Sequence, residues 1–341
     1  MGNPEKQSDV YRKINTAFLA IIASVAATIA LIYTKPFLMP LVISLMIYTA
    51  IVPAVRFLSG KLKMPRLLAA GITFAFILVA STLLILLILN SVNSFIAGTY
   101  AYEQKISATL SWLTKISEQY GYPLNFSSFS EAMASLPVFN LIKGMGHYVF
   151  AIITNAVLCF IFLLFFFLGG ESLKISDKRS FSIVLEIQNK ISYYIVFKAL
   201  ISAATGFTIW LILYIFGVEM ALIFGLLTFV LNFIPNAGSI LATILPLPVM
   251  FLQYGLSPKF FILLGLLILA QFTLGNIVDP KILGEGVDLH PVFILCALVF
   301  WTLVWGIAGA FLAIPLMVAL KIVLSNITPA KPLAELMAGR F

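Results

Sequence analysis

The sequence predicts an all-α polytopic membrane protein, with about six full transmembrane helices and two broken, re-entrant helical hairpins that form an inverted repeat. Hydrophobic residues occupy 62% of the 341 positions and charged residues only 10%, whereas soluble domains carry about 25% charged residues. Several apolar runs approach the roughly 20 residues that cross a bilayer. Two longer apolar segments, 221–252 and 291–324, each contain a central break. In the alternative topology each broken segment crosses once, which gives eight transmembrane spans.

Three transmembrane helices are expected in the N-terminal region, residues 1–90, at about 14–33, 37–55 and 67–90. The first follows basic residues, as a signal peptide does, but it is long for that role and lacks a convincing cleavage site. We therefore expect a retained helix.

A polar segment at 91–146 follows, and we expect it to be extracytoplasmic. Residues 147–190 then hold a fourth helix, to about 168, and a charged cytoplasmic linker that is helical in part. Lys and Arg concentrate in the loops 56–66 and 169–190. Because basic residues favour the cytoplasmic side of a membrane, both termini are expected to be cytoplasmic.

The transport region is expected at 191–341 and contains a repeat. Each unit, at about 195–252 and 260–324, is one crossing helix followed by one broken segment. A shift of 69 residues aligns the two broken segments and places Gly217, Phe224, Val230 and Pro246 on Gly286, Phe293, Val299 and Pro315. The repeating unit would thus occur in opposite orientations, as in many secondary transporters.

Length favours hairpins over plain spans. A straight helix through either broken segment would run to roughly 48 Å, beyond a hydrocarbon core of about 30 Å. Each half of about 15 residues reaches roughly 22 Å, so neither half is expected to cross alone. Backbone groups freed at a break persist in a membrane only where protein buries them or where they line a watery cavity. The breaks therefore indicate a transport site.

Polar residues near the first break are candidates for binding a substrate or an ion. Asn232 and Asn236 flank Pro235, and they either cap the interrupted helices or face a solute. On the helix at 260–278 polar and small residues share one face, which suits either interhelical hydrogen bonds or a solute site. The full candidate set is Asn232, Pro235, Asn236, Gly238, Gln271, Asn276 and Asp279.

Ionisable residues precede both broken segments. Glu219, Asp288 and His290 either cap helices at the interface or couple transport to protons. Lys198 lies one turn into the fifth predicted helix, at about 195–216, and can snorkel to the inner face. The expected hairpin tips or hinges are Gly306, Gly309, Pro246 and Pro315.

Other classes of function lack their signatures. The sequence has no G-x-x-x-x-G-K-[ST] loop, no H-E-x-x-H motif and no paired Cys/His cluster, so we expect neither an enzyme nor a cofactor or metal. Its net charge of +8 comes from residues between apolar runs and does not indicate nucleic acid. Cys159 and Cys296 both fall in apolar runs, which argues against a disulfide framework.

Four motifs in register resemble the autoinducer-2 exporter family of bacterial transporters: "NFIPNAGSILATILP" (232–246), "GNIVDPKILG" (275–284), "VDLHP" (287–291) and "GIAGAFLAIP" (306–315). The resemblance implies a multi-pass inner-membrane protein, homo-oligomeric, that moves a small solute outward. Some members are linked to the quorum-sensing signal autoinducer-2, and others look like sodium- or lithium-proton antiporters. The family commonly has Pro-Tyr-x-Gly-Pro at the first break, where this chain has Pro235-Asn236-Ala237-Gly238-Ser239.

These observations lead to one functional prediction and two alternatives. The prediction is a secondary transporter that exports a small polar solute, similar to autoinducer-2, by alternating access around the broken helices. The first alternative is a sodium (lithium)/proton antiporter. The second is a non-transporting membrane scaffold organised by the polar segment 91–146.

Overall fold

The computed structural model describes residues 4–61, 63–65, 68–76, 78–79, 82–83, 86, 119, 156–169, 178–235, 237–282 and 288–340. Within these ranges every regular element is a helix and none is a strand, which confirms the predicted all-α class. The predicted polar segment 91–146 lies outside the described residues, apart from Gln119.

A single residue separates the first two helices, α1 (Pro4–Tyr33) and α2 (Lys35–Lys61). The carbonyl of Thr34 accepts hydrogen bonds from the backbone N–H groups of Phe37 and Leu38, at 3.0 and 2.9 Å. Pro36 lies in the first turn of α2, where its missing N–H breaks no helical hydrogen bond. The predicted boundary is therefore confirmed, although α1 begins earlier and α2 ends later than the predicted spans.

The chain divides into two compact units, which are described separately. One unit comprises residues 1–47, 158–173 and 289–341, and the other comprises residues 48–157 and 174–288.

The second unit is built on a long helix, α6 (Lys178–Ile215). Its 38 residues would extend about 57 Å, well beyond a hydrocarbon core of about 30 Å. The helix runs without a break from the predicted cytoplasmic linker into the predicted fifth span. Four further helices follow it: α7 (Ala221–Leu231), α8 (Ala237–Ile244), α9 (Leu247–Tyr254) and α10 (Pro258–Phe272).

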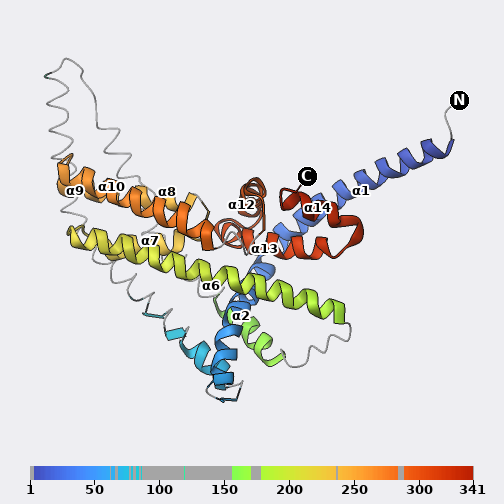
Figure 1. The fold of residues 1–341 in the computed structure, drawn as a ribbon, viewed down its shortest axis with the longest axis horizontal. Coiled ribbons are helices and arrows are strands. Elements are labelled where there is room, and N and C mark those ends of the chain that lie inside the picture. Colours follow the sequence, from blue (N-terminus) through green and yellow to red (C-terminus); the bar gives the residue numbers. More distant parts are fainter. Residues whose placement is uncertain are drawn as a thin grey trace. The chain divides into compact units, whose positions relative to one another are not determined.

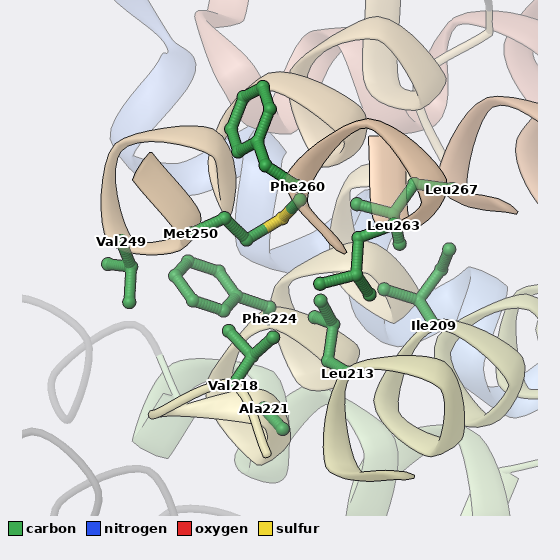
Figure 2. Close-up of a cluster of buried hydrophobic side chains, with 10 residues drawn as sticks. All are labelled: Ile209, Leu213, Val218, Ala221, Phe224, Val249, Met250, Phe260, Leu263 and Leu267. Carbon is green, nitrogen blue, oxygen red and sulfur yellow. The ribbon is translucent and has the colours of Figure 1, made fainter. Parts of the chain in front are cut away.

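An apolar cluster packs α6 against α7, α9 and α10 (Figures 1 and 2). Ile209 and Leu213 of α6 and Leu263 and Leu267 of α10 are all 0% exposed, and Phe224 joins them from α7. Lipid tails are as apolar as leucine, so close packing rather than exclusion of water holds such helices together in a bilayer. The cluster fixes the register of α6 against α10.

Two glycines bring α6 and α7 into backbone contact. A Cβ atom on Gly206 would lie 2.6 Å from the carbonyl oxygen of Gly225, and one on Gly225 would lie 2.8 Å from that of Gly206. Small residues at a crossing point let membrane helices approach this closely. This contact fixes the register of α6 against α7.

In the first unit, α12 (Pro291–Trp305) and α13 (Ile307–Ser325) pack against each other. Gly306 separates them with a φ of 70°, a conformation that glycine adopts without steric strain. A short 3₁₀ turn, η2 (Thr328–Ala330), leads to the final helix, α14 (Lys331–Met337), which packs on α13.

Four described helices are long and apolar enough to cross a membrane: Lys35–Lys61, Arg179–Ile215, Pro258–Ile282 and Ile307–Ser325. The last of these corrects one expectation, because half of the second broken segment was predicted to be too short to cross. At 19 residues α13 reaches about 28 Å, close to the thickness of a hydrocarbon core. In the first broken segment α7 and α8 have 11 and 8 residues, which is shorter than the expected halves of about 15.

Candidate functional site

The chain folds back on itself at the first predicted break, between α7 and α8. A Cβ atom on Gly238 would lie only 1.9 Å from the carbonyl oxygen of Leu231. In a continuous helix residues seven positions apart are separated by roughly 10.5 Å along the axis. The contact therefore requires a reversal of the chain, and only glycine fits at this point of α8.

Asn232 ends α7 and connects that helix to α6. Its side chain is 3% exposed, and its amide Nδ2 donates a hydrogen bond to the Ser202 hydroxyl at 3.1 Å. Its backbone N–H bonds to the carbonyls of Thr228 and Val230. The side chain thus joins two helices rather than capping its own.

A π-helical turn, η1 (Thr273–Val278), follows α10 where a plain helix was predicted. Such turns are rare and are frequently found at functional sites, because the extra residue shifts the hydrogen-bond ladder. Gly275 lies within the turn, and a Cβ atom there would meet the Ser239 hydroxyl oxygen at 3.2 Å. The start of α8, at the first hairpin tip, therefore rests on η1.

A buried ion pair joins α6 to the residue that follows η1. The ammonium of Lys198 lies 2.5 Å from Oδ2 of Asp279, and the two side chains are 3% and 19% exposed. The expectation that Lys198 snorkels to the membrane surface is therefore wrong. An isolated charge is costly inside a membrane, so ionisable groups there pair and mark functional pathways.

The other predicted binding residues are placed differently. Gln271 is 5% exposed, Pro235 and Gly238 are partly or fully buried, and Asn276 is exposed. Asn276 lies at the far edge of the predicted polar face, which agrees with its exposure. Asn236 lies outside the described residues.

The second break also reverses the chain. A Cβ atom on Gly309 would lie 1.9 Å from the carbonyl oxygen of Trp301, eight residues earlier. Of the two predicted proline hinges, Pro246 separates α8 from α9, whereas Pro315 lies inside α13 without ending it. The two broken segments thus share a tight reversal with a buried glycine but differ in their second halves.

The predicted proton-coupling residues do not belong to the ion pair. They lie just before helices, Glu219 before α7 and Asp288 and His290 before α12. Glu219 is exposed, and its backbone N–H donates to Oε1 of Gln253 at 3.0 Å. Asp288 is exposed with a φ of 44°. His290 caps α12, because its Nδ1 accepts a 3.4 Å hydrogen bond from the backbone N–H of Val292.

Sequence reasoning missed three parts of this site. It did not pair Lys198 with Asp279, it did not find the π-helical turn, and it overlooked Ser202 and Thr228, which are both 0% exposed. One signal was present: a lysine and an aspartate in two apolar helices of opposite direction suggest a pair, because a lone charge there is unfavourable.

Apolar helices of spanning length, chain reversals between short apolar helices and a buried ion pair define a multi-pass membrane protein of the transporter class. The chain belongs to the AI-2E transporter family, whose model, described as "AI-2E family transporter", matches residues 19–328. It is therefore a membrane transporter of the bacterial inner membrane. The resemblance seen in the four motifs is confirmed.

Individual relatives agree with this assignment. The chain is 26% identical over 313 residues to "AI-2 transport protein TqsA" of Escherichia coli strain K12, covering 90% of each chain. It is 23% identical over 329 residues to a "Putative transport protein" of Haemophilus influenzae, covering 92% of this chain and 93% of that one. A match to a "Putative transport protein" of Borreliella burgdorferi reaches 35% identity over 156 residues, or 42% of that protein. These relatives are named as transport proteins and not as enzymes.

Proposed function

We propose that the protein is a secondary transporter that exports a small polar solute across the bacterial cytoplasmic membrane. One observation carries the proposal: the first hairpin tip rests on a π-helical turn beside a buried ion pair. In this proposal the α7–α8 hairpin gates a site near the middle of the membrane, and access to that site alternates between the two sides.

Physical chemistry supports this arrangement. A π-helical turn and a chain reversal both leave backbone groups outside the regular helical ladder, and such groups need protein, water or solute as partners inside a membrane. The contact between Ser239 and Gly275 is a side-chain hydroxyl against a glycine, which offers little resistance to separation. The ion pair next to it keeps the local net charge at zero.

The remaining features of the proposal come from sequence. The two broken segments would re-enter the membrane as an inverted repeat, both termini would be cytoplasmic, and the protein would be a homo-oligomer. The printed name of the Escherichia coli relative includes AI-2 transport, so autoinducer-2 is the first solute to test.

Inverted membrane vesicles test the proposal, because export from the cell becomes uptake into the vesicle. Gly275→Leu would place a wedge between η1 and the hairpin tip, and we expect it to lower autoinducer-2 uptake at least tenfold. Ser239→Gly in the same chain should restore part of the uptake by making room. Gly265→Leu is the matched control on the same helix segment, because no atom lies within 4 Å of a Cβ there.

Two results would contradict the proposal. Vesicles with the unaltered protein that accumulate neither autoinducer-2 nor any other polar solute would exclude export. Full uptake by Gly275→Leu would remove the hairpin tip from the gate.

Sodium (lithium)/proton antiport is the second candidate function, and the unpaired carboxylate oxygen of Asp279 favours it. Oδ1 of Asp279 is buried and has no hydrogen-bond partner among the described residues, so a carboxylate oxygen is free to bind a small cation or a proton. Proteoliposomes with a pH-sensitive dye would measure sodium-dependent proton flux. Antiport requires that Asp279→Asn abolish this flux, and an unchanged flux would count against it.

A further inference from the structure

The contact between α6 and α10 changes from apolar to polar along its length. Both helices contribute apolar residues at one end and polar residues at the other. Ile209 and Leu267 belong to the apolar cluster, and Lys198 pairs with Asp279 at the other end. Between these ends α6 carries Ser202 and Thr205, three residues apart, and α10 with η1 carries Gln271 and Gly275, four residues apart. The helices are antiparallel, and the register set by the Lys198–Asp279 pair and the apolar cluster brings Thr205 to about the level of Gln271.

Helix α7 contributes to the same level. Gly225 contacts Gly206, and Asn232 bonds to Ser202 one turn further along α6. Thr228 lies between Gly225 and Asn232, and hence at the level of Thr205. By this helix register Thr205, Thr228 and Gln271 come to one level of α6, α7 and α10, which we call the polar layer.

The polar layer contains polar atoms that lack partners. Thr228 Oγ1 and both amide atoms of Gln271, Oε1 and Nε2, are buried and make no hydrogen bond to any described residue. Thr228 is 0% exposed and Gln271 5% exposed. Thr205 already donates its hydroxyl to the carbonyl of Ile201 at 2.8 Å. Native proteins rarely leave buried polar side chains unpaired, and each case calls for a bound ligand or a functional reason.

We propose that Thr228 and Gln271 bind a small, uncharged, hydroxyl-bearing solute within the polar layer. This inference rests on the proposed export function and names the substrate class of the same site. An amide offers one acceptor and two donor hydrogens, and a threonine hydroxyl both donates and accepts. A solute hydroxyl also does both, so it satisfies either side chain.

The charges nearby favour a neutral solute over an ion. None of the three residues of the layer is ionisable, and the charges of Lys198 and Asp279 two turns away compensate each other. An ion in the layer would bring an unpaired charge to membrane depth, which is unfavourable. A neutral solute leaves the balance unchanged.

The solute would reach the polar layer from the level between that layer and the ion pair. There Ser202 bonds to Asn232, and Ser239 at the hairpin tip touches Gly275. Movement of the tip away from η1 would open the polar layer from this side. The solute would then pass uncharged hydrogen-bonding groups before it reaches Gln271.

Near-isosteric apolar variants test the proposal with two measurements. Gln271→Leu and Thr228→Val remove the unpaired atoms, so the thermal unfolding temperature of the purified protein should stay the same or rise. Uptake of autoinducer-2 and of radiolabelled erythritol into inverted vesicles should fall about tenfold for each hydrogen bond lost. A purely structural role predicts the opposite pattern.

One control variant should show that opposite pattern, and a second should show no change. Gln253→Leu removes the acceptor of the Glu219 backbone N–H, so it should lower the unfolding temperature and leave uptake per folded protein unchanged. Thr208→Val removes only a hydroxyl that bonds to its own helix, at Ala204, and should change neither quantity.

Three results would contradict the inference, and each overturns a different part of it. Unchanged uptake by Gln271→Leu and Thr228→Val overturns the assignment of the polar layer. Uptake of lactate or sodium but of no neutral probe overturns the substrate class and leaves transport standing. A protein that moves no probe of any kind overturns both the inference and the export function.

Discussion

The indole Nε1–H of Trp305 donates a 3.0 Å hydrogen bond to the backbone carbonyl of Leu31, which ties the second hairpin to the end of α1. Leu31 lies in the last turn of α1, where backbone carbonyls lack partners within the helix. Trp305 is 3% exposed and immediately precedes the turn at Gly306. The hairpin tip is thus fastened to the junction of α1 and α2 by a bond that satisfies both groups.

Trp305→Phe should therefore destabilise the protein by about 0.5–1.5 kcal/mol, because the partly buried Leu31 carbonyl would lose its donor. Thermal unfolding in detergent measures the change. Trp301→Phe is a matched control four residues away, since the indole N–H of Trp301 is buried and has no partner among the described residues. Its loss should be neutral or slightly stabilising, and equal destabilisation by the two variants would contradict this explanation.

Replacing one member of the Lys198–Asp279 pair should be far worse than replacing both. Lys198→Met or Asp279→Leu alone leaves a buried charge unpaired, and such changes destabilise proteins by about 3–5 kcal/mol. The double variant contains no such charge and should recover most of that stability. A double-mutant cycle of unfolding measurements checks this, and additive losses would show that the two side chains do not interact.

Gly206→Ala should destabilise the protein by about 1–3 kcal/mol, because added atoms in a close-packed contact force the backbone to move. The new Cβ would lie 2.6 Å from the Gly225 carbonyl oxygen, and backbone cannot yield as a side chain does. Gly265→Ala adds the same atom where none lies within 4 Å, and it favours the helix. If both variants unfold at the same temperature, the glycine contact is not important for stability.

The hairpin topology predicts on which side two loops lie. In a variant without Cys159 and Cys296, a cysteine at Gly255 should react with an impermeant maleimide added outside the cell. A cysteine at Gly284 should react only in inverted vesicles. The reverse pattern, with Gly255 cytoplasmic and Gly284 external, would rule out the inverted hairpin model.

Much of this fold follows from apolar length and from helix-breaking residues. The sequence alone predicted the helical class and the boundary at Thr34, because composition and proline chemistry act locally. The chain reverses at both predicted breaks, near Pro235 and near Gly306. The second half of the second broken segment was expected to have about 15 residues, whereas α13 has 19 and continues through Pro315.

The site was predictable in its residue types but not in its pairings. Asn232, Gln271 and Asp279 were predicted because they are polar residues within apolar runs. Polar groups in a membrane are costly unless they have a partner or a function. The partners of these residues depend on helix register, which is set by the Gly206–Gly225 contact and the apolar cluster. The π-helical turn has no local sequence signal, and it directly precedes Asp279, which pairs with Lys198.

The C-terminal residues have a consequence for how this protein can be shortened or tagged. The backbone N–H of His290, just before α12, donates to the carbonyl of Met337 at 2.9 Å. Gly339 has a φ of 75°, and a Cβ there would lie 2.6 Å from the imidazole ring of His290. Residues 337–339 therefore pack against the start of the second hairpin. A protein truncated after α13 would lose this contact. A bulky fusion joined directly at Gly339 would clash with His290.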